Sequence, residues 1–336
     1  MSTVEVRAAL EAYVDALVAR ADFARFFTDD VQASIVGTPQ QATGPHAVEQ
    51  TIICLLARGH LLIEDVPGVG KTTLAHALAR SLDCSFRRIQ FTSDLLPSDI
   101  LGISVFNRQK QGFEFMPGPI FAHIVLADEI NRTTPKTQSS LLEAMNEAQV
   151  SMDNETRPLP QPFMVIATQN PAEHHGTFPL PESQLDRFLM RIGIGYPDAV
   201  AEKQVLDRPA ALHPAHEVEA VLTGHDVLEL QNMVDKVRLD DLIQDYLLAI
   251  VTHTRRSELL ALGVSTRGAV ALSRAAKALA FVRNRSYCIP DDVKELAPVI
   301  LPHRVMLKAG FGARGARFDE ARQVISDIVE SVPVPL

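Results

Sequence analysis

The sequence predicts an α/β protein with a parallel sheet flanked by helices, followed by a helical C-terminal domain. Segments with helical periodicity lie between several short apolar runs, and this alternation favours a parallel sheet. After Tyr196 and Pro197 the strand pattern stops, and helical periodicity continues to the end of the chain. The apolar runs, each bounded by loops and typical of buried strands, are 61–63, 86–91, 123–128, 163–168 and 188–194.

The amino-terminal part is predicted to be helical. A helix-period apolar stripe of this kind usually packs on its own domain, although a helix that docks on a partner would show the same pattern. A second helix is expected over 47–57, directly before the first apolar run. The stripe consists of Val6, Leu10, Tyr13, Val14 and Leu17.

Helices and hairpins are expected between the strands. Helical patterns cover 72–82 and 136–148, and Thr134 and Pro135 supply a capping residue and a first-turn proline for the second of them. Two stretches are typical of hairpins, because a polar turn separates two arms in each. These stretches are 103–119, with its turn at 107–112, and 149–160, with its turn at 153–156.

The C-terminal third shows helical periodicity only. Pro290 stands at one helix start, where Asp291 and Asp292 favour the positive end of the helix dipole. The predicted helices lie near 226–237, 241–256, 267–283, 291–297 and 318–330.

Composition excludes several classes of protein. Apolar residues make up 46% and charged residues 22%, as in folded proteins. The formal net charge of −9 argues against general coating of nucleic acid. Cys54, Cys84 and Cys288 lie far apart and in no C-x-x-C spacing, which is typical of a reducing compartment and predicts neither a disulfide framework nor a zinc site.

Targeting signals are not evident in the sequence. The first 20 residues do not resemble a secretory signal, because no basic start leads into an unbroken apolar stretch. The most apolar early region, 51–66, is interrupted at 58–60, well before the ~20 residues that a membrane helix needs. We therefore expect a cytoplasmic protein without membrane insertion.

A phosphate-binding loop is predicted between the first strand and the helix after it. Glycines let backbone N–H groups close around anionic oxygens, Lys71 supplies a charge to the β and γ phosphates, and Thr72 offers a hydroxyl to Mg²⁺. The helix dipole adds to this attraction. The strict pattern has glycine where this chain has Asp65. The predicted binding residues are Gly68, Val69, Gly70, Lys71, Thr72 and Thr73.

Polar side chains end two further apolar strands. Asp128 and Glu129 follow the run 123–128, and we expect Asp128 to reach the Mg²⁺ shell while Glu129 orients and deprotonates the attacking water. Asn170 ends the run 163–168 and would lie at the same sheet edge as Asp128 and Gly70, since ligands gather at that edge. Asn170 could hold the lytic water, sense the γ-phosphate or merely turn the chain before Pro171.

These residues, with three longer stretches, resemble a MoxR-type AAA+ ATPase. The stretches are RIQFTSDLLPSDILG, FEFMPGPIFAHIVLADEINRTTPKTQSSLLEAMNEAQVSMD and FMVIATQNPAEHHGTFPLPESQLDRFLMRI. The resemblance implies a ring, usually hexameric, with ATP between neighbouring subunits, and places the two hairpins as the helix-2 insert and the pre-sensor-1 hairpin. Together with the sequence patterns, it gives an expected division into an N-terminal helical extension over 1–30, which precedes the part that shows the resemblance, an ATPase core over 31–197 and a helical lid domain over 198–336.

The resemblance also suggests roles for single residues. Arg187 resembles the arginine finger that completes the site of the adjacent subunit, although it could pair with Asp186 instead, and Arg191 or Arg132 could take the role. Arg267 resembles sensor 2, which would tie the lid to the nucleotide. Ile35, Val36 and Gly37 resemble the segment that packs on adenine. His174 and His175 lack a third ligand at zinc spacing, so we expect no metal beyond the Mg²⁺ bound with ATP.

Three functions were compared. The leading one is an ATP-hydrolysing chaperone or remodelling factor for assembly, activation or metal insertion of client proteins, among which the resemblance suggests proteins with von Willebrand A-like domains. The alternative is an AAA+ nucleic-acid motor or loader; Arg108 and Lys110 in the first hairpin turn favour it, whereas the net charge disfavours it. A nucleotide-gated scaffold is disfavoured by the presence of both Asp128 and Glu129.

Overall fold

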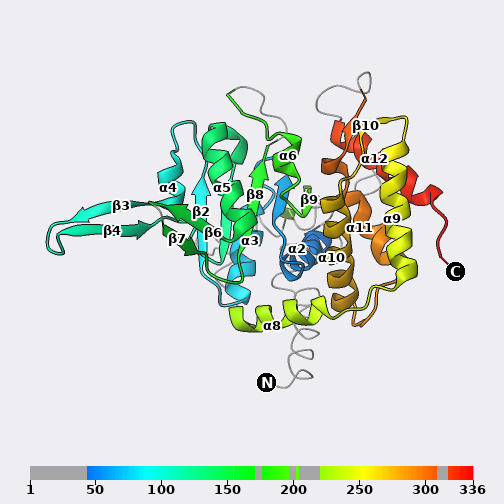
Figure 1. The fold of residues 1–336 in the computed structure, drawn as a ribbon, viewed down its shortest axis with the longest axis horizontal. Helices are drawn as coiled ribbons and strands as arrows, with labels where there is room; N and C mark the ends of the chain where they lie inside the picture. The colour runs from blue at the N-terminus through cyan, green and yellow to red at the C-terminus, as the bar shows by residue number, and fades with distance from the viewer. Residues whose placement is uncertain are drawn as a thin grey trace.

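The computed structural model describes residues 44–153, 155–170, 176–196, 202–203, 220–308 and 317–335. Its centre is a five-stranded sheet in the order β2-β5-β8-β1-β9, in which every neighbouring pair is parallel (Figure 1). The predicted parallel sheet is therefore confirmed, with its strands at the predicted positions. The strands are β1 (Leu61–Glu64), β2 (Phe86–Gln90), β5 (Ile124–Asp128), β8 (Met164–Gln169) and β9 (Met190–Ile192).

Helices cover both faces of the sheet. Side chains alternate along a strand, so Leu61 and Ile63 pack with α2 and α3 on one face, while Leu62 packs with α4 and α5 on the other. Both faces are apolar, which explains the unbroken apolar runs in the sequence. The core helices are α2 (Gly44–Leu56), α3 (Lys71–Ser81), α4 (Pro97–Leu101), α5 (Pro135–Glu147), α6 (Glu182–Leu185) and the 3₁₀ turn η2 (Ile130–Arg132).

Thr134 and Pro135 stand where the sequence placed them, at the start of α5. The Thr134 side chain, however, accepts no backbone hydrogen bond as a cap; its hydroxyl lies 3.2 Å from that of Thr137. The predicted helix start is therefore confirmed, but the capping bond is not formed.

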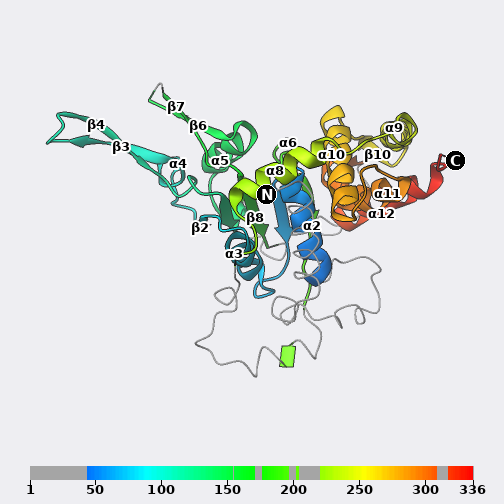
Figure 2. The ribbon, with the colours of Figure 1, turned by 90° about the horizontal axis from the view of Figure 1, so that it is seen from below.

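Both predicted hairpins project from the sheet on the side away from the C-terminal domain (Figures 1 and 2). They contact one another: the Arg157 guanidinium lies 4.0 Å from the centre of the Phe115 ring, and the Ser104 hydroxyl donates to Asp153 at 2.5 Å. The first hairpin pairs β3 (Gly102–Asn107) with β4 (Gly112–Pro117), and the second pairs β6 (Gln149–Met152) with β7 (Glu155–Pro158).

The C-terminal domain is a bundle of helices beside β9, as predicted. It also holds a small antiparallel pair, β10 (Leu260–Leu262) with β11 (Met306–Leu307), which the sequence analysis missed because strands this short show no periodicity. One predicted helix, 291–297, runs further and includes Pro298. The helices are α8 (Gly224–Asp235), α9 (Asp241–Arg256), α10 (Thr266–Val282), α11 (Pro290–Ile300), α12 (Arg317–Ser331) and the 3₁₀ turn η4 (Pro302–Arg304).

The structure also describes the three cysteines and the length of the apolar helices. Cys54 and Cys288 are buried and Cys84 is partly buried, and all three are free thiols. None of the helices within the described ranges is long and apolar enough to cross a bilayer.

His60 links three elements of the core. Its Nδ1 accepts the Val165 N–H of β8 at 3.0 Å, which leaves the proton on Nε2, 2.9 Å from the Met145 carbonyl oxygen of α5. Burial lowers the pKa of His60 to about 4. The ring is therefore neutral in the folded protein at physiological pH.

We expect this histidine to make stability depend on pH. Because its folded pKa lies below its unfolded value of about 6.5, the unfolded chain binds more protons between these values, and stability is lost as the pH falls from 6.5 through 4. The loss should reach about 3 kcal/mol. Denaturant unfolding at pH 7 and pH 4.5 should show a smaller difference for His60→Gln, whose amide can make both bonds without titrating. The exposed His253→Gln is the control; an equal difference in all three proteins would contradict the assignment.

Candidate active site at the carboxyl edge of the sheet

The strand register brings the predicted phosphate loop and acids to one edge. Glu64 of β1 pairs with Gln169 of β8, and Asp128 of β5 pairs with Gln90 of β2. Because all strands run in parallel, the residues that follow β1, β8 and β5 emerge together at their carboxyl ends. The structure thus brings the phosphate loop, Asn170 and the two acids to one edge.

The phosphate loop folds into the start of α3. Gly68 and Gly70 have φ angles of 87° and 90°, in the left-handed region that glycine adopts without strain. A Cβ on Gly68 would meet nothing within 4 Å, so the loop is open on its outer side. The Lys71 ammonium donates to the Asp65 carbonyl oxygen at 2.7 Å, back across the loop. An open loop of backbone N–H groups at a helix N-terminus fits a phosphate chain.

Asp65, which stands where the strict pattern has glycine, anchors this loop. Its Oδ2 accepts the backbone N–H groups of Ile194 and Gly195 at 2.7 and 2.6 Å, and its Oδ1 accepts that of Val66 at 2.7 Å. The carboxylate therefore ties the loop to the turn after β9. The sequence noted the departure at this position but not its contacts, which depend on residues far along the chain.

Asp128 is nearly buried and is held by two neighbouring strands. Its Oδ1 accepts the Thr168 hydroxyl at 2.5 Å, and its Oδ2 accepts Arg88 Nη2 and Nε at 2.6 and 3.2 Å. Sequence reasoning missed Arg88, because its place beside Asp128, opposite Leu126, follows from the pairing of β2 with β5. The Asp128 carboxylate and the Thr72 hydroxyl are oxygen donors of the kind that Mg²⁺ prefers.

Glu129 adopts a strained backbone conformation just beyond β5. Its φ of 57° is rare for a residue with a side chain, and such strain is often found at functional sites. The carboxylate accepts Gln90 Nε2 at 2.7 Å and lies 3.2 Å from Arg132 Nη1. The carboxylate has to leave Arg132 before it can act as a base, and Gln90 is a further residue that the sequence analysis did not single out.

Asn170 follows β8 and is 7% exposed. Its side chain is therefore largely enclosed at the edge that also carries Asp128. Ile35, Val36 and Gly37, His174 and His175, and the first helix lie outside the described residues.

Arg187 lies at the opposite end of the sheet. It precedes β9, and Leu61 at the start of β1 pairs with Met190 at the start of β9, so Arg187 is at the amino ends of these strands. The length of β1 alone separates it from its own phosphate loop by roughly 10 Å. Among the described residues, its buried Nη1 atom has no hydrogen-bond partner. A role at its own nucleotide is thus disfavoured.

Two of the alternatives raised for Arg187 are that it pairs with Asp186 and that Arg191 takes its role. In the structure Asp186 and Arg191 both have other partners. Asp186 faces two other arginines, with its Oδ1 2.9 Å from Arg304 Nε and its Oδ2 3.8 Å from Arg267 Nη1. Arg191 is fixed by an ion pair with Glu64, and its guanidinium lies 3.6 Å from the centre of the Phe318 ring. Arg191 is also only 14% exposed, which disfavours it as the trans-acting arginine.

Arg267 starts α10 after Ser265, whose hydroxyl accepts the Gly268 N–H at 3.2 Å as a helix cap. Its side chain is 63% exposed and lies beside Asp186. In this structure Arg267 is therefore on the same side of the sheet as Arg187. The proposed role of Arg267 in tying the lid to the nucleotide stays a prediction.

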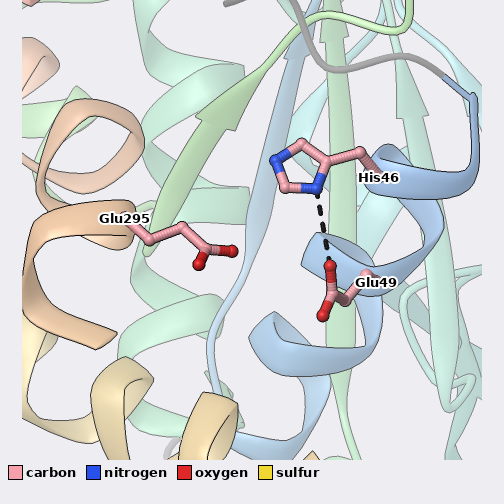
Figure 3. A group of neighbouring side chains, drawn as sticks. All are labelled: His46, Glu49 and Glu295. Atoms are coloured by element: carbon pink, nitrogen blue, oxygen red, sulfur yellow. Dashed lines mark ion pairs between the residues drawn. The ribbon is translucent and has the colours of Figure 1, made fainter. Parts of the chain in front are cut away.

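One cluster of possible metal ligands lies elsewhere, where α2 meets the C-terminal helices. His46, Glu49 and Glu295 face one another there (Figure 3), with His46 Nδ1 3.4 Å from Glu49. The guanidinium of Arg283 contacts both acids, at 3.6 Å from Glu49 and 2.7 Å from Glu295. A guanidinium therefore already lies against both carboxylates, and the cluster is an ionic link between the two domains.

Three features of this structure define an AAA+ nucleotide-binding protein. The phosphate loop follows β1, the two acids stand at the end of β5, which β8 separates from β1 in the sheet, and a helical domain lies beside the sheet. The comparisons agree. A family described as "ATPase family associated with various cellular activities (AAA)" matches residues 60–190, and an "AAA lid domain" matches residues 252–328.

Relatives that match most of the chain show which family of AAA+ ATPases it belongs to. The chain is 39% identical to the protein named Chaperone MoxR1 of Mycobacterium tuberculosis, over 91% of this chain and 81% of that protein. It is 50% identical to the protein YeaC of Bacillus subtilis, over 85% and 88% of the two chains. A crystal structure of a protein from Cytophaga hutchinsonii assigned as an ATPase superposes with a TM-score of 0.81 at 36% identity, covering 99% of both chains. The chain belongs to the MoxR family of AAA+ ATPases.

Proposed function

We propose that this protein hydrolyses ATP as a ring, usually a hexamer, and acts as a chaperone or remodelling factor in the assembly, activation or metal insertion of client proteins. One observation carries the proposal: the phosphate loop and the acids meet at one edge of the sheet, while Arg187 lies at the other. A subunit with this arrangement completes its site only with a neighbour. The name of the Mycobacterium relative supports the chaperone role.

Each residue of the site has a separate task in this proposal. Bound Mg·ATP supplies the phosphoanhydride bond and a divalent charge; Thr72 and Asp128 would hold the cation. Gly68, Val69, Gly70, Lys71 and Thr73 bind the phosphates. Glu129 takes a proton from the attacking water, and Asn170 holds that water or the γ-phosphate.

In this proposal Arg187 and Arg267 act on the neighbouring subunit. Because Arg187 and Arg267 lie together and far from their own phosphate loop, both are proposed to contact the nucleotide of the adjacent subunit. Guanidinium groups stabilise the charge that spreads over the transferred phosphoryl oxygens. Arg267 would thereby connect lid position with the state of the neighbouring site.

Some predictions rest on the resemblance alone. These are adenine contacts by Val36 and Gly37 and clients with von Willebrand A-like domains. A cytoplasmic location and the division into 1–30, 31–197 and 198–336 rest on sequence patterns and stay predictions.

The proposal predicts that ATP hydrolysis depends on assembly. Because each site needs two subunits, the rate per subunit should rise steeply with protein concentration, in step with ring formation measured by light scattering. A constant rate per subunit at concentrations where the protein is monomeric would contradict it. Single-stranded DNA should leave the rate unchanged; a several-fold stimulation would instead favour a nucleic-acid motor.

A further inference from the structure

Arg304, on the turn η4 of the C-terminal domain, is a buried arginine with an unusual set of contacts. Its side chain is only 2% exposed. Its guanidinium donates to backbone carbonyl oxygens of the segment that holds Arg187: Asp186 at 3.3 Å, Phe188 at 2.6 Å and Leu189 at 3.2 Å. It also bonds the carbonyl oxygen of Ile300 on its own domain. One side chain thus fixes the residues on both sides of Arg187.

The Asp186 side chain completes this arrangement. Its Oδ1 lies 2.9 Å from Arg304 Nε, so the buried charge of Arg304 is balanced by the residue directly before Arg187. Burial lowers the pKa of Arg304 to about 10, which still leaves it charged at neutral pH. A charged fork with a matched carboxylate and several carbonyl acceptors has one well-defined position.

The aliphatic part of the Arg304 side chain packs against the helix that carries Arg267. A Cβ on Gly268, in the first turn of α10, would come within 3.0 Å of Arg304 Cδ. The start of α10 therefore packs directly on Arg304, and Arg267 reaches Asp186 from there at 3.8 Å. Arg304 thus bonds the backbone on both sides of Arg187 and packs against the first turn of the helix that carries Arg267.

We propose that Arg304 is a positioning residue for Arg187: it fixes the backbone of the Arg187 segment to the lid, so that lid movement moves Arg187. The inference rests on the proposed function, in which Arg187 acts on the neighbouring subunit. Displacement of a catalytic group by about 1 Å can lower a rate by ~10²-fold. Lysine cannot bridge four carbonyl groups as a planar fork does. Arg304→Lys should therefore reduce kcat by about 10²-fold, with KM for ATP nearly unchanged because the phosphate loop is intact.

Mixed rings distinguish this role from a general structural one. Arg304→Lys subunits should regain activity when mixed with Lys71→Ala subunits, because an intact phosphate loop then meets a well-placed Arg187. They should not regain activity with Arg187→Ala subunits, since no interface in that mixture has a functional Arg187. If Arg304 merely supports its own nucleotide site, the two results would be reversed, and the proposal would be wrong.

Three controls keep the test decisive. Arg285→Lys alters another arginine of the same domain, paired with buried Asp292, that does not touch the Arg187 segment; it should not behave like Arg187→Ala in mixtures. Asp186→Asn weakens the same contact from the other side and replaces Arg304→Lys if that variant fails to fold. Co-assembled mixtures of Arg187→Ala with Lys71→Ala test the proposed function itself: if they recover no activity, Arg187 does not act on the neighbouring subunit. If they recover activity but mixtures of Arg304→Lys with Lys71→Ala do not, only the positioning role of Arg304 is refuted.

Discussion

Replacing Glu129 by glutamine should lower kcat for ATP hydrolysis by ~10² to 10⁴-fold and leave nucleotide affinity close to that of the wild type. Glutamine keeps the size of the side chain, but it cannot take a proton from water. The affinity should persist because Glu129 contacts Gln90 and Arg132 rather than the phosphate loop.

Lys71→Ala is the matched comparison, because it removes a charge from the phosphate loop itself. It should weaken binding of a fluorescent ATP analogue, whereas Glu129→Gln should reduce phosphate release without weakening that binding. If Glu129→Gln released phosphate at close to the wild-type rate, the general base would have to be another residue. The Glu129→Gln ring should also retain its client longest, which makes it the protein to use for client identification.

Most of the fold could be predicted from the sequence because its strands are buried on both faces. Runs such as 163–168 are apolar throughout, and helical periods separate them, so the strand and helix positions were clear. The end of α11 could not be predicted, because a proline such as Pro298 normally indicates the end of a helix. Its missing N–H forfeits only one helical hydrogen bond, and the surrounding residues Ala297 and Val299 are buried, so packing outweighs the loss.

The candidate site was predictable where its chemistry is local. The phosphate loop and Asp128 with Glu129 are contiguous motifs that end apolar strands. Arg88 and Gln90 were missed because their contacts with these acids, 40 and 39 residues further along the chain, arise only when β2 pairs with β5. The side of the sheet on which Arg267 lies depends on how the C-terminal domain packs, and no local pattern encodes that placement.

Arg187→Ala should lower the rate of ATP hydrolysis by ~10³-fold or more, with little effect on ATP binding to the same subunit. The reason is the position of Arg187 at the amino end of β9, at least the length of β1 from its own phosphate loop. Its guanidinium can then stabilise charge only on a nucleotide held by a neighbour. A mixture with Lys71→Ala should recover part of the activity, because some interfaces pair an intact phosphate loop with an intact Arg187.

The same mixtures decide the role of Arg267. Since Arg267 lies 3.8 Å from Asp186, Arg267→Ala should behave like Arg187→Ala: activity returns in mixtures with Lys71→Ala and stays low in mixtures with Arg187→Ala. An arginine that closed the lid over its own nucleotide would give the opposite pattern, because its defect would lie in the same subunit as that of Lys71→Ala. If Arg267→Ala regained activity in mixtures with Arg187→Ala, in rings shown by cross-linking to contain both variants, Arg267 would act on the nucleotide of its own subunit.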